Sequence, residues 1–569
     1  MIRIILSLLT FSALSTSMAE TAKEEVQRPN ILIILADDLG YSDLGCYGGE
    51  IRTPNLDSLA KNGLRFTRSY NSSRCCPSRA SLLTGLYPHQ AGIGRFVGNG
   101  KLPGYRGRLT ERCVTLAEVL EPSGYATYAS GKWHVNDPSP TKRGFREFYG
   151  FVHGYAVDSW DPSMMIRLPE GRKAKIYPAG NYFATDAISD HALEFLDTAR
   201  KTGQPWLLYT AYQAPHFPIQ APPELSATYE KIYQQGWDKL RLKRLKKMKE
   251  LGIIPANLSL PPRSPIDDLK VAAKKGSLTK DGHNPAWDSL PADRRADLAR
   301  RMAVYAAMVE GMDANIGRLL ASLRKNGEME NTLIIFLSDN GACAEWEPFG
   351  FDLGSARKKN NQPGRGINSY TPGKPNHLHT GDELSAMGGP GSLFSYGSAW
   401  ANLSNTPLWL YKHYAHEGGI RTPMIVHWPA QIAKGGELRN QVTHIMDIMA
   451  TCVDVAGVDY PKKFRGNTIL PLEGQSLLPA IKGKETPLRS LVFEHERNAA
   501  LLEGDWKLVG QKVIARNSLV KDKTKWHLYN LANDPAEQID RSQDEPERLD
   551  RMIKTLQHEA SRTFILPAP

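Results

Sequence analysis

The sequence has few cysteines, and none of them is spaced like a metal-binding pair. Six cysteines are scattered through 569 residues, at positions 46, 75, 76, 113, 343 and 452. A disulfide framework is typical of short chains with many cysteines, and structural zinc sites commonly use a Cys-x-x-Cys spacing that is missing here. The cysteines therefore predict neither a disulfide scaffold nor a zinc domain.

Long apolar runs are missing beyond the N-terminus. The most apolar later segments, residues 31–35 and 333–337, have the length of a strand, whereas a membrane-spanning helix needs about 20 apolar residues. At the N-terminus, Arg3 precedes a short uncharged apolar stretch, and small residues surround Ala19. We interpret residues 1–19 as a secretory signal peptide rather than an anchor. A secreted or periplasmic protein without stable membrane insertion is expected.

Acidic residues are outnumbered by basic ones, so the formal net charge is +11. Such a surface favours anionic partners, and a polyanionic substrate or a nucleic acid would both fit it. The densest basic run, residues 239–249, carries Leu242, Leu245 and Met248 at helical spacing. This spacing predicts an amphipathic surface helix. We expect no nucleic-acid partner.

Strand-like and helix-like segments alternate along most of the chain. The predicted strands are residues 30–35, 125–129, 206–212 and 332–337. The predicted helices are residues 54–63, 114–120, 186–199 and 298–323. The first strand is almost continuously apolar, which is typical of a parallel sheet covered on both faces. This pattern predicts the α/β class, with a large mixed, mostly parallel central sheet flanked by helices on both faces.

The pattern changes after a helix predicted near residues 445–455. Short alternating segments then predict a smaller layer of strands, and a final helix follows them. These segments are residues 491–494, 499–502, 506–513, 526–530 and, for the helix, 550–562. We therefore divide the chain after the signal peptide into residues 20–455 and residues 456–569.

Polar residues follow three of the predicted strands. Asp37 and Asp38 come after the first strand, His216 after the third, and Asp339 and Asn340 after the fourth. Each residue alone has the ordinary role of a helix cap or turn former. Their shared placement favours a site, because ligands collect at the carboxyl ends of parallel strands. The carboxylate and amide oxygens suit Ca²⁺, and suit Mg²⁺ less, since Mg²⁺ seldom takes an all-protein cage.

Residues 75–85 place a cysteine at the start of a predicted helix that ends at Gly85. The free N–H groups of a helix N-terminus, together with Arg79 one turn later, stabilise negative charge on Cys75. This is a position suited to a nucleophile. Two alternatives remain open from the residues alone, because a lone cysteine is more often a buried inert thiol and Cys76 permits a vicinal disulfide.

The order Cys75-Cys76-Pro77-Ser78-Arg79, followed by Thr84-Gly85, resembles the signature of the type I sulfatases. These belong to the alkaline phosphatase-like superfamily, and the bacterial arylsulfatase-like and polysaccharide sulfatases are the most similar. In that family a formylglycine-generating enzyme oxidises the first cysteine to formylglycine, whose hydrated aldehyde supplies the attacking oxygen. The resemblance therefore implies that Cys75 is not a thiol in the active protein.

Two further segments resemble the metal motifs of sulfatases: residues 37–43, with the pattern Asp-Asp-x-Gly-x-x-Asp, and residues 338–341, Ser-Asp-Asn-Gly. Carried over by position, one calcium ion would be held by Asp37, Asp38, Asp339, Asn340 and an oxygen at position 75. Asp43, the last residue of the first motif, is expected to be structural.

Three more segments resemble the rest of a sulfate pocket: residues 131–134 (Gly-Lys-Trp-His), residues 214–216 (Ala-Pro-His) and Lys412, which is separated by four residues from Glu-Gly-Gly. A lone lysine or histidine would ordinarily be a surface group or a satisfied core residue. The resemblance assigns catalysis to Cys75, Arg79, Lys132, His134, His216, Asp339 and Lys412.

The roles in this set are also implied by the resemblance. The two lysines, the arginine and calcium surround the sulfate, and Asp339 takes a proton from the attacking hydroxyl. His216 protonates the leaving alcohol, and His134 takes the proton of the second hydroxyl so that sulfate is released. The sequence does not determine which of the two histidines has which role. Substrate contacts are assigned to Lys132, His216, Lys412, His495 and Arg497, the last two also being compatible with a solvated turn.

The substrate is suggested by residues 341–405, which are rich in Gly, Pro, Asn and Ser. Tyr396 and Trp400 in this segment either stack on sugar rings or anchor the segment itself. Parts of residues 395–407 resemble bacterial sulfatases associated with sulfated polysaccharides, so a carbohydrate sulfate is expected. Residues 504–535 resemble the sulfatase C-terminal subdomain, a small antiparallel sheet. The alternatives are a phosphonate or phosphate ester hydrolase of the same superfamily and a non-catalytic sulfated-glycan-binding protein.

Overall fold

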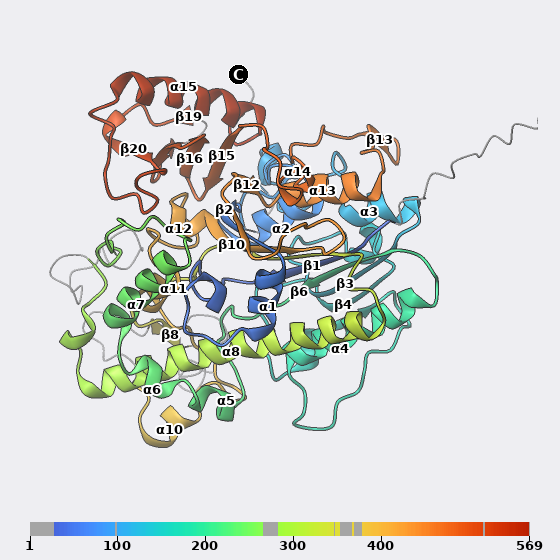
Figure 1. Cartoon of the computed structure of the whole chain (residues 1–569), viewed down its shortest axis with the longest axis horizontal. Coiled ribbons are helices and arrows are strands. Elements are labelled where there is room, and N and C mark those ends of the chain that lie inside the picture. The colour runs from blue at the N-terminus through green and yellow to red at the C-terminus, as the bar shows by residue number, and fades with distance from the viewer. Residues whose placement is uncertain are drawn as a thin grey trace, which may run out of the picture.

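The computed structural model describes residues 28–96, 100–265, 283–345, 348–352, 367–368, 378–515 and 518–567. The predicted signal peptide, residues 1–19, lies outside these ranges. Figure 1 shows a central sheet with helices above and below it, and a second, smaller sheet near the C-terminus.

The central sheet is built from ten of the described strands. They are β1 (Asn30–Ala36), β2 (Leu64–Tyr70), β3 (Ala126–Lys132), β4 (Glu147–Phe151), β5 (Ile166–Leu168), β6 (Trp206–Ala211), β7 (Thr332–Ser338), β10 (Arg421–His427), β11 (Glu437–Arg439) and β12 (Thr443–His444). Their order is β11-β2-β10-β7-β1-β6-β3-β4-β5, with β12 also paired to β2. The run from β7 to β4 is parallel, whereas β10 is antiparallel to β2 and β7. The predicted mixed, mostly parallel sheet is confirmed.

Helices cover both faces of this sheet, as predicted (Figure 1). One face is covered by α1 (Pro54–Asn62), α4 (Ala184–Arg200) and α8 (Ala292–Lys325). The other is covered by α2 (Cys75–Thr84), α3 (Leu116–Leu120), α13 (Asp447–Ala456) and α14 (Leu478–Ile481). Strand β1 shows why its sequence is continuously apolar, because Leu32 and Ile34 pack on the first face while Ile31, Ile33 and Leu35 pack on the second.

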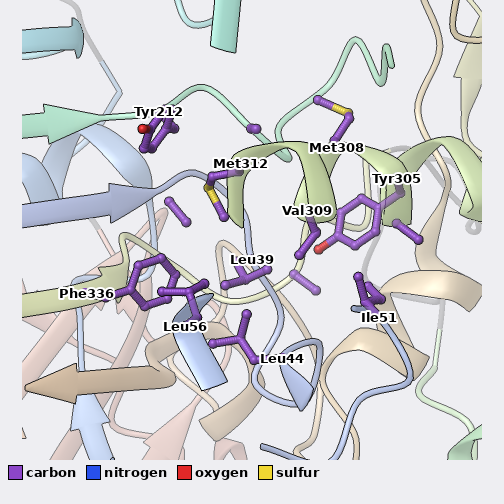
Figure 2. Close-up of a cluster of buried hydrophobic side chains, with 14 of the residues drawn as sticks. Leu39, Leu44, Ile51, Leu56, Tyr212, Tyr305, Met308, Val309, Met312 and Phe336 are labelled. Atoms are coloured by element: carbon purple, nitrogen blue, oxygen red, sulfur yellow. The ribbon is translucent and has the colours of Figure 1, made fainter. Parts of the chain in front are cut away.

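The first face has a core beneath α8. In Figure 2, Val309 and Met312 of that helix point toward Leu39 of the segment that follows β1, Met308 lies on the opposite side of the helix, and Phe336 of β7 lies nearby. All five side chains are buried. This packing fixes the segment after β1 against the helix layer, and that segment begins with the two aspartates of the predicted site.

The amphipathic helix predicted over the basic run forms, but one residue of its predicted apolar face was wrong. Helix α7 (Trp237–Glu250) forms over the basic run, but Leu242 points outward with 57% of its surface exposed, while Leu245 and Met248 are buried. Arg244 takes a place on the buried face because its guanidinium pairs with Asp43 at 2.7 Å. The buried face of the helix therefore includes a paired arginine, which the spacing of apolar residues did not predict.

The aromatic residues of the long Gly-rich segment are anchors. Helix α11 (Ser398–Ser404) carries Trp400, which is fully buried with its ring 5.0 Å from Trp237. Tyr396 stacks on Tyr305 of α8 at 4.4 Å. These rings hold the segment to the helix layer, so the sugar-stacking alternative is wrong for both. Much of the segment, residues 353–366 and 369–377, lies outside the described ranges.

The C-terminal sheet is antiparallel, as expected from the resemblance. Its strands are β15 (Ser490–His495), β16 (Asn498–Glu503), β17 (Trp506–Gly510) and β20 (Trp526–Asn530), and α15 (Pro546–Arg562) packs against it. The division at residue 455 stays a prediction.

The remaining described α-helices and strands are short. They are α5 (Pro223–Ala227), α6 (Glu230–Tyr233), α10 (Gly381–Ser385), α12 (Glu417–Ile420), β8 (Phe351–Asp352), β9 (Ile367–Asn368), β13 (Lys463–Phe464), β14 (Asn467–Thr468), β18 (Ile514–Ala515) and β19 (Ser518–Leu519). In the part of the chain that the structure describes, no helix has both the length and the apolar character needed to cross a membrane.

Candidate active site

The carboxyl ends of adjacent strands bring the predicted acidic residues together. Ala36 at the end of β1 is paired with Ser338 at the end of β7, so the aspartates that follow the two strands are neighbours. The backbone N–H of Asp339 donates to the carbonyl of Ala36 at 3.2 Å, and that of Asp38 lies 3.4 Å from Asp339 Oδ1. All five positions predicted to hold the metal, including residue 75, are buried, with at most 1% of their surface exposed.

Helix α2 presents Cys75 at its N-terminus and Arg79 one turn later, and it ends at Gly85, whose φ of 71° lies in the left-handed region. Arg79 is fully buried. Its Nε donates to Asp339 Oδ2 at 2.9 Å and its Nη1 to the carbonyl of Lys132 at 2.8 Å. The arginine therefore ties the helix to the ends of both β7 and β3, and so places position 75 over the acidic residues.

Two buried lysines reach the same aspartates. Lys132, the last residue of β3, donates to Asp37 Oδ2 at 2.5 Å. Lys412 Nζ lies 2.9 Å from Asp38 Oδ1 and 3.4 Å from His216 Nε2. Charge attraction to Asp38 raises the pKa of Lys412 although burial would lower it. The site therefore holds two fixed ammonium groups in surroundings from which water is largely excluded.

The backbone that carries Lys412 is packed tightly against the backbone after β7. A Cβ on Gly341 would lie 1.8 Å from the carbonyl oxygen of Gly418, so a glycine is required at this contact. Lys412 N–H also donates to the carbonyl of Ala342 at 3.1 Å. These contacts fix the backbone of the second lysine against the segment that follows Asp339 and Asn340.

The acidic residues fit a hard divalent cation. The Oδ1 atoms of Asp37 and Asn340 are buried and have no hydrogen-bond partner among the described residues, an arrangement that is costly unless a ligand is present. Asn340 Nδ2 donates to Asp38 Oδ1 at 2.6 Å, which leaves the amide oxygen as the available ligand atom. Asp37, Asp38, Asp339 and Asn340 together offer only oxygens, the ligands that Ca²⁺ prefers.

The pKa values of the carboxyls agree with this. Burial, and then the charge of Asp339, raise the pKa of Asp37 to about 7. Burial also raises the pKa of Asp339. Asp38 is different, because His216 and Lys412 overcome the effect of burial and lower its pKa. A bound cation would favour the charged form of Asp37 and Asp339, the two whose pKa is raised.

Two histidines also lie in the pocket, one near Cys75 and one near Asp38. A ring nitrogen of His134 lies within 4.8 Å of Cys75 Sγ, and burial lowers the pKa of His134 to about 4. His216 Nδ1 bonds to the carbonyl of Phe217, so its Nε2 faces Asp38 at 3.4 Å. Burial lowers the pKa of His216 as well. Asp38 and His134 both have a positive φ, 67° and 54°, a strained conformation often found at functional sites.

Cys75 lies in an electropositive environment. All six cysteines are free, so the vicinal disulfide with Cys76 does not form. Burial would raise the pKa of Cys75, but the neighbouring Cys76, His134 and the two lysines lower it well below its usual value. A thiol with this pKa is unlike an inert buried one.

Asp43 lies beneath the pocket in a structural role, as expected. It accepts bonds from the N–H of Gly40 at 2.9 Å, from Arg244 at 2.7 Å and from the hydroxyl of Tyr305 at 2.7 Å. These bonds hold the turn after Asp38 to helices α7 and α8. Asp43 is therefore connected to the helix layer.

The two substrate contacts predicted near the C-terminus differ in their surroundings. His495 is fully buried, and its ring lies 5.8 Å from that of His413, the residue after Lys412. Arg497 lies in the turn between β15 and β16, where its Nε donates to the carbonyl of Ile514 at 2.7 Å. A substrate-binding role for either residue stays a prediction.

Sequence reasoning missed several side chains around the pocket. Arg74 and His413 are adjacent in the chain to Cys75 and Lys412, a signal that was available. Phe96, Tyr155 and Glu345 had no such signal, because they belong to segments without a motif and reach the pocket only in the folded chain.

Comparisons with known proteins agree with this geometry. Residues 29–458 match the family described as Sulfatase, and residues 407–563 match N-sulphoglucosamine sulphohydrolase, C-terminal. An uncharacterized sulfatase of Schizosaccharomyces pombe is 32% identical, with 97% of each chain covered. An arylsulfatase of Klebsiella aerogenes is 32% identical over 81% of this chain and 93% of the relative.

Among solved structures, Ps i-CgsB in complex with k-i-k-neocarrahexaose superposes with a TM-score of 0.62. It is 25% identical, and the match covers 95% of this chain and 94% of the other. The family match spans every residue of the pocket described above, from Asp37 to Lys412. The chain therefore belongs to the type I sulfatase family of the alkaline phosphatase-like superfamily, and it is a sulfuric ester hydrolase.

Proposed function

We propose that this sulfatase hydrolyses a sulfate monoester on a carbohydrate, with Cys75 oxidised to formylglycine and one calcium ion bound. The observation that carries the proposal is the meeting of Cys75, two buried lysines and a set of unpartnered buried oxygens in one pocket. A bound calcium ion would supply positive charge toward a sulfate oxygen, and the oxidised residue 75 a hydrated aldehyde as the nucleophile.

The charges of the described residues suit an anionic substrate only when the metal site is filled. Arg79, Lys132 and Lys412 are matched by Asp37, Asp38 and Asp339. A divalent ion held by the aspartates and Asn340 would therefore leave a positive excess. The lysines are then able to turn from carboxylate to sulfate oxygens, where they stabilise charge that moves during the reaction.

In this proposal the two histidines transfer protons. His134, with its pKa lowered to about 4 by burial, is neutral near pH 7 and can accept a proton at position 75. His216 has its Nδ1 engaged with the carbonyl of Phe217, so its Nε2 is the atom that donates to the leaving alcohol. An incoming sulfate anion would favour the protonated form of His216, whose pKa is otherwise lowered by burial.

A carbohydrate substrate is supported by two similarities. The C-terminal match is to a sulphohydrolase of N-sulphoglucosamine, and a structural neighbour was solved with a neocarrahexaose. Residues 1–19 are proposed to direct export to the periplasm or outside the cell. Activity would then require a formylglycine-generating enzyme in the host.

The first prediction concerns Cys75. Cys75→Ala removes the proposed nucleophile, so sulfate release from 4-nitrophenyl sulfate and sulfated sugars should fall by at least about 10³-fold. The matched control is Cys76→Ala, which should keep most of the activity because the Cys76 thiol packs in the apolar core and faces the carbonyl of Arg95 at 3.7 Å. Retained activity in Cys75→Ala, with an unchanged circular dichroism spectrum, would show that the nucleophile is elsewhere.

Mass spectrometry tests the modification independently. The tryptic peptide containing Cys75 should lose one sulfur and two hydrogens and gain one oxygen when the protein is made with a formylglycine-generating enzyme. A peptide that stays a thiol in a fully active preparation would refute the proposed nucleophile.

Faster turnover of phosphonate esters than of sulfate esters would favour the phosphonate hydrolase alternative.

A further inference from the structure

A second group of polar side chains borders the pocket next to Cys75. This rim cluster consists of Arg74, Glu345, His413, His495 and Glu496. Arg74 Nη1 donates to Glu496 Oε1 at 3.0 Å, and His413 Nε2 lies 2.8 Å from Glu345 Oε1. The cluster joins the start of α2, the segment after β7, the segment before α12 and the end of β15, so four distant parts of the chain form one surface.

Two aromatic rings connect the rim cluster to the catalytic histidines. The ring of Phe96 lies 5.6 Å from that of His134, and the guanidinium of Arg74 lies over Phe96 at 4.6 Å. Tyr155 lies 6.2 Å from Phe96 and 6.4 Å from His216, and 45% of its surface is exposed. Phe96 and Tyr155 therefore lie beside the histidines that would surround the leaving alcohol. Aromatic faces pack well against the apolar face of a sugar.

The rim cluster contains buried polar atoms that the described chain does not use. Both ring nitrogens of His495 and the Nε of Arg74 are buried and have no hydrogen-bond partner among the described residues. His495 is fully buried, with 0% of its surface exposed. Buried polar groups are normally satisfied, so these three nitrogens indicate the place of a ligand.

The charges of the rim cluster leave no positive excess. Arg74 and His413 face Glu345 and Glu496, and His413 Nδ1 lies 3.5 Å from Glu496 Oε2. Burial keeps His495 neutral near pH 7, because it lowers the pKa to about 3. A further anion would therefore gain nothing here and would meet two carboxylates.

A metal ion fits this cluster poorly, although His413, His495 and Glu496 place a ligand atom each within 4.8 Å of one another. The guanidinium of Arg74 lies 3.0 Å from the same glutamate and 3.3 Å from His413 Nδ1. The guanidinium is therefore already in contact with atoms that would have to act as metal ligands. Hydroxyl groups, which both donate and accept, suit the unused nitrogens.

We infer that the rim cluster binds the part of the substrate that leaves as the alcohol, and that it selects an uncharged sugar ring with free hydroxyls over a ring bearing a carboxylate or a second sulfate. The inference rests on the proposed function and adds the charge class of the substrate. In it, Arg74 and His495 bind sugar hydroxyls, Phe96 and Tyr155 pack on the ring, and Glu496 excludes a second anion.

Phenyl sulfate and 4-carboxyphenyl sulfate test the exclusion by charge. The ratio of kcat/KM for the carboxylated substrate to that for the neutral one is measured in the wild type, in Glu496→Gln and in a control. Removing the charge of Glu496 leaves Arg74 unopposed, so the ratio should rise about tenfold. Differences in leaving-group chemistry cancel because each variant is compared with the wild type on the same pair.

The matched control is Glu503→Gln, which removes one charge at the opposite end of the same β15–β16 hairpin. This variant should leave the ratio unchanged. An unchanged ratio in Glu496→Gln, or an equal rise in both variants, would overturn the inference while the proposed function stands. No turnover of either sulfate by the oxidised wild type would overturn both.

A second variant tests the hydroxyl contacts. His495→Phe should raise KM for a neutral monosaccharide monosulfate about tenfold, and should leave KM for phenyl sulfate nearly unchanged, because phenyl sulfate has no hydroxyls. A structural role for His495 would change both KM values together. That result, or the absence of turnover on every neutral monosulfated sugar of a panel, would contradict the inference.

Discussion

At the scale of single residues, Arg79 shows how one side chain can organise a pocket. The sequence predicted a cation that contacts sulfate, whereas the folded chain gives its Nε and Nη1 protein partners, Asp339 and the carbonyl of Lys132. The rigid fork of a guanidinium can bind a carboxylate and a carbonyl together, which a lysine cannot do. Arg79 therefore holds the helix that carries position 75 in register with two strand ends.

The second prediction concerns Asn340, whose buried amide oxygen has no hydrogen-bond partner in the described part of the chain. Calcium at about 100 times its dissociation constant should stabilise the wild type by about 2.7 kcal/mol, because the ion binds the folded state. Asn340→Ala removes one ligand, so most of this stabilisation should be lost at the same calcium concentration. Thermal unfolding with calcium and with a chelator measures both.

The control for Asn340 is Asn62→Ala, an exposed asparagine at the end of α1. It should show the same calcium-dependent rise in melting temperature as the wild type. An equal rise in Asn340→Ala would mean that the unpartnered oxygen is not a metal ligand.

At the scale of elements, the small C-terminal sheet holds the loop of the second lysine. Lys507 of β17 lies 2.8 Å from Glu417 Oε1 and 2.9 Å from Glu537 Oε1, with all three side chains fully buried. Glu417 begins α12, and its N–H donates to Glu537 at 2.8 Å. This buried contact ties the sheet to the segment that carries Lys412, five residues before Glu417.

The third prediction follows from this contact. Lys507→Met keeps the length of the side chain but leaves two buried carboxylates without their ammonium group. The free energy of unfolding should fall by about 3–5 kcal/mol, as measured by urea denaturation. Lys523→Met, at an exposed ion pair with Asp550, is the control and should change stability by no more than about 0.5 kcal/mol. A similar small change in both variants would argue against the buried contact as a stabilising element.

At the scale of the whole molecule, the same cluster predicts how stability depends on pH. Burial, together with the charge of Glu417, raises the pKa of Glu537 to about 7 from a usual value near 4.5. Between these values the folded protein binds a proton that the unfolded chain does not. Glu537 therefore increases the free energy of unfolding at low pH. This contribution is lost as the pH rises from about 4.5 to 7.

The fourth prediction tests that sign. Glu537→Gln cannot ionise, so the decrease in unfolding free energy between pH 5 and pH 7 should be smaller in this variant than in the wild type. Urea denaturation at both pH values provides the comparison, and other groups cancel because both proteins contain them. An equal decrease in the two proteins would show that Glu537 has no raised pKa in the folded state.

Much of the architecture could be predicted because strands and helices depend on the pattern of neighbouring residues in the chain. Residues 30–35 are apolar on both faces of a strand, and Cys75 to Gly85 carries both the start and the end of a helix. The predicted helix at residues 114–120 instead begins at Leu116, because Thr115 and Glu118 form a capping box. The side of α7 that is buried could not be predicted, because Arg244 is buried by a partner 201 residues away.

The order of residues by itself determined the elements, the sheet class and the motif residues of the pocket, because each of these depends on neighbours in the chain or on a short fixed pattern. Only the tertiary structure decided that Tyr396 and Trp400 anchor a segment, that Arg79 bridges two strand ends, and that Arg74 meets Glu496. Such contacts depend on distance in space, and the free energy of burying a charge or a ring depends on partners that no local pattern specifies.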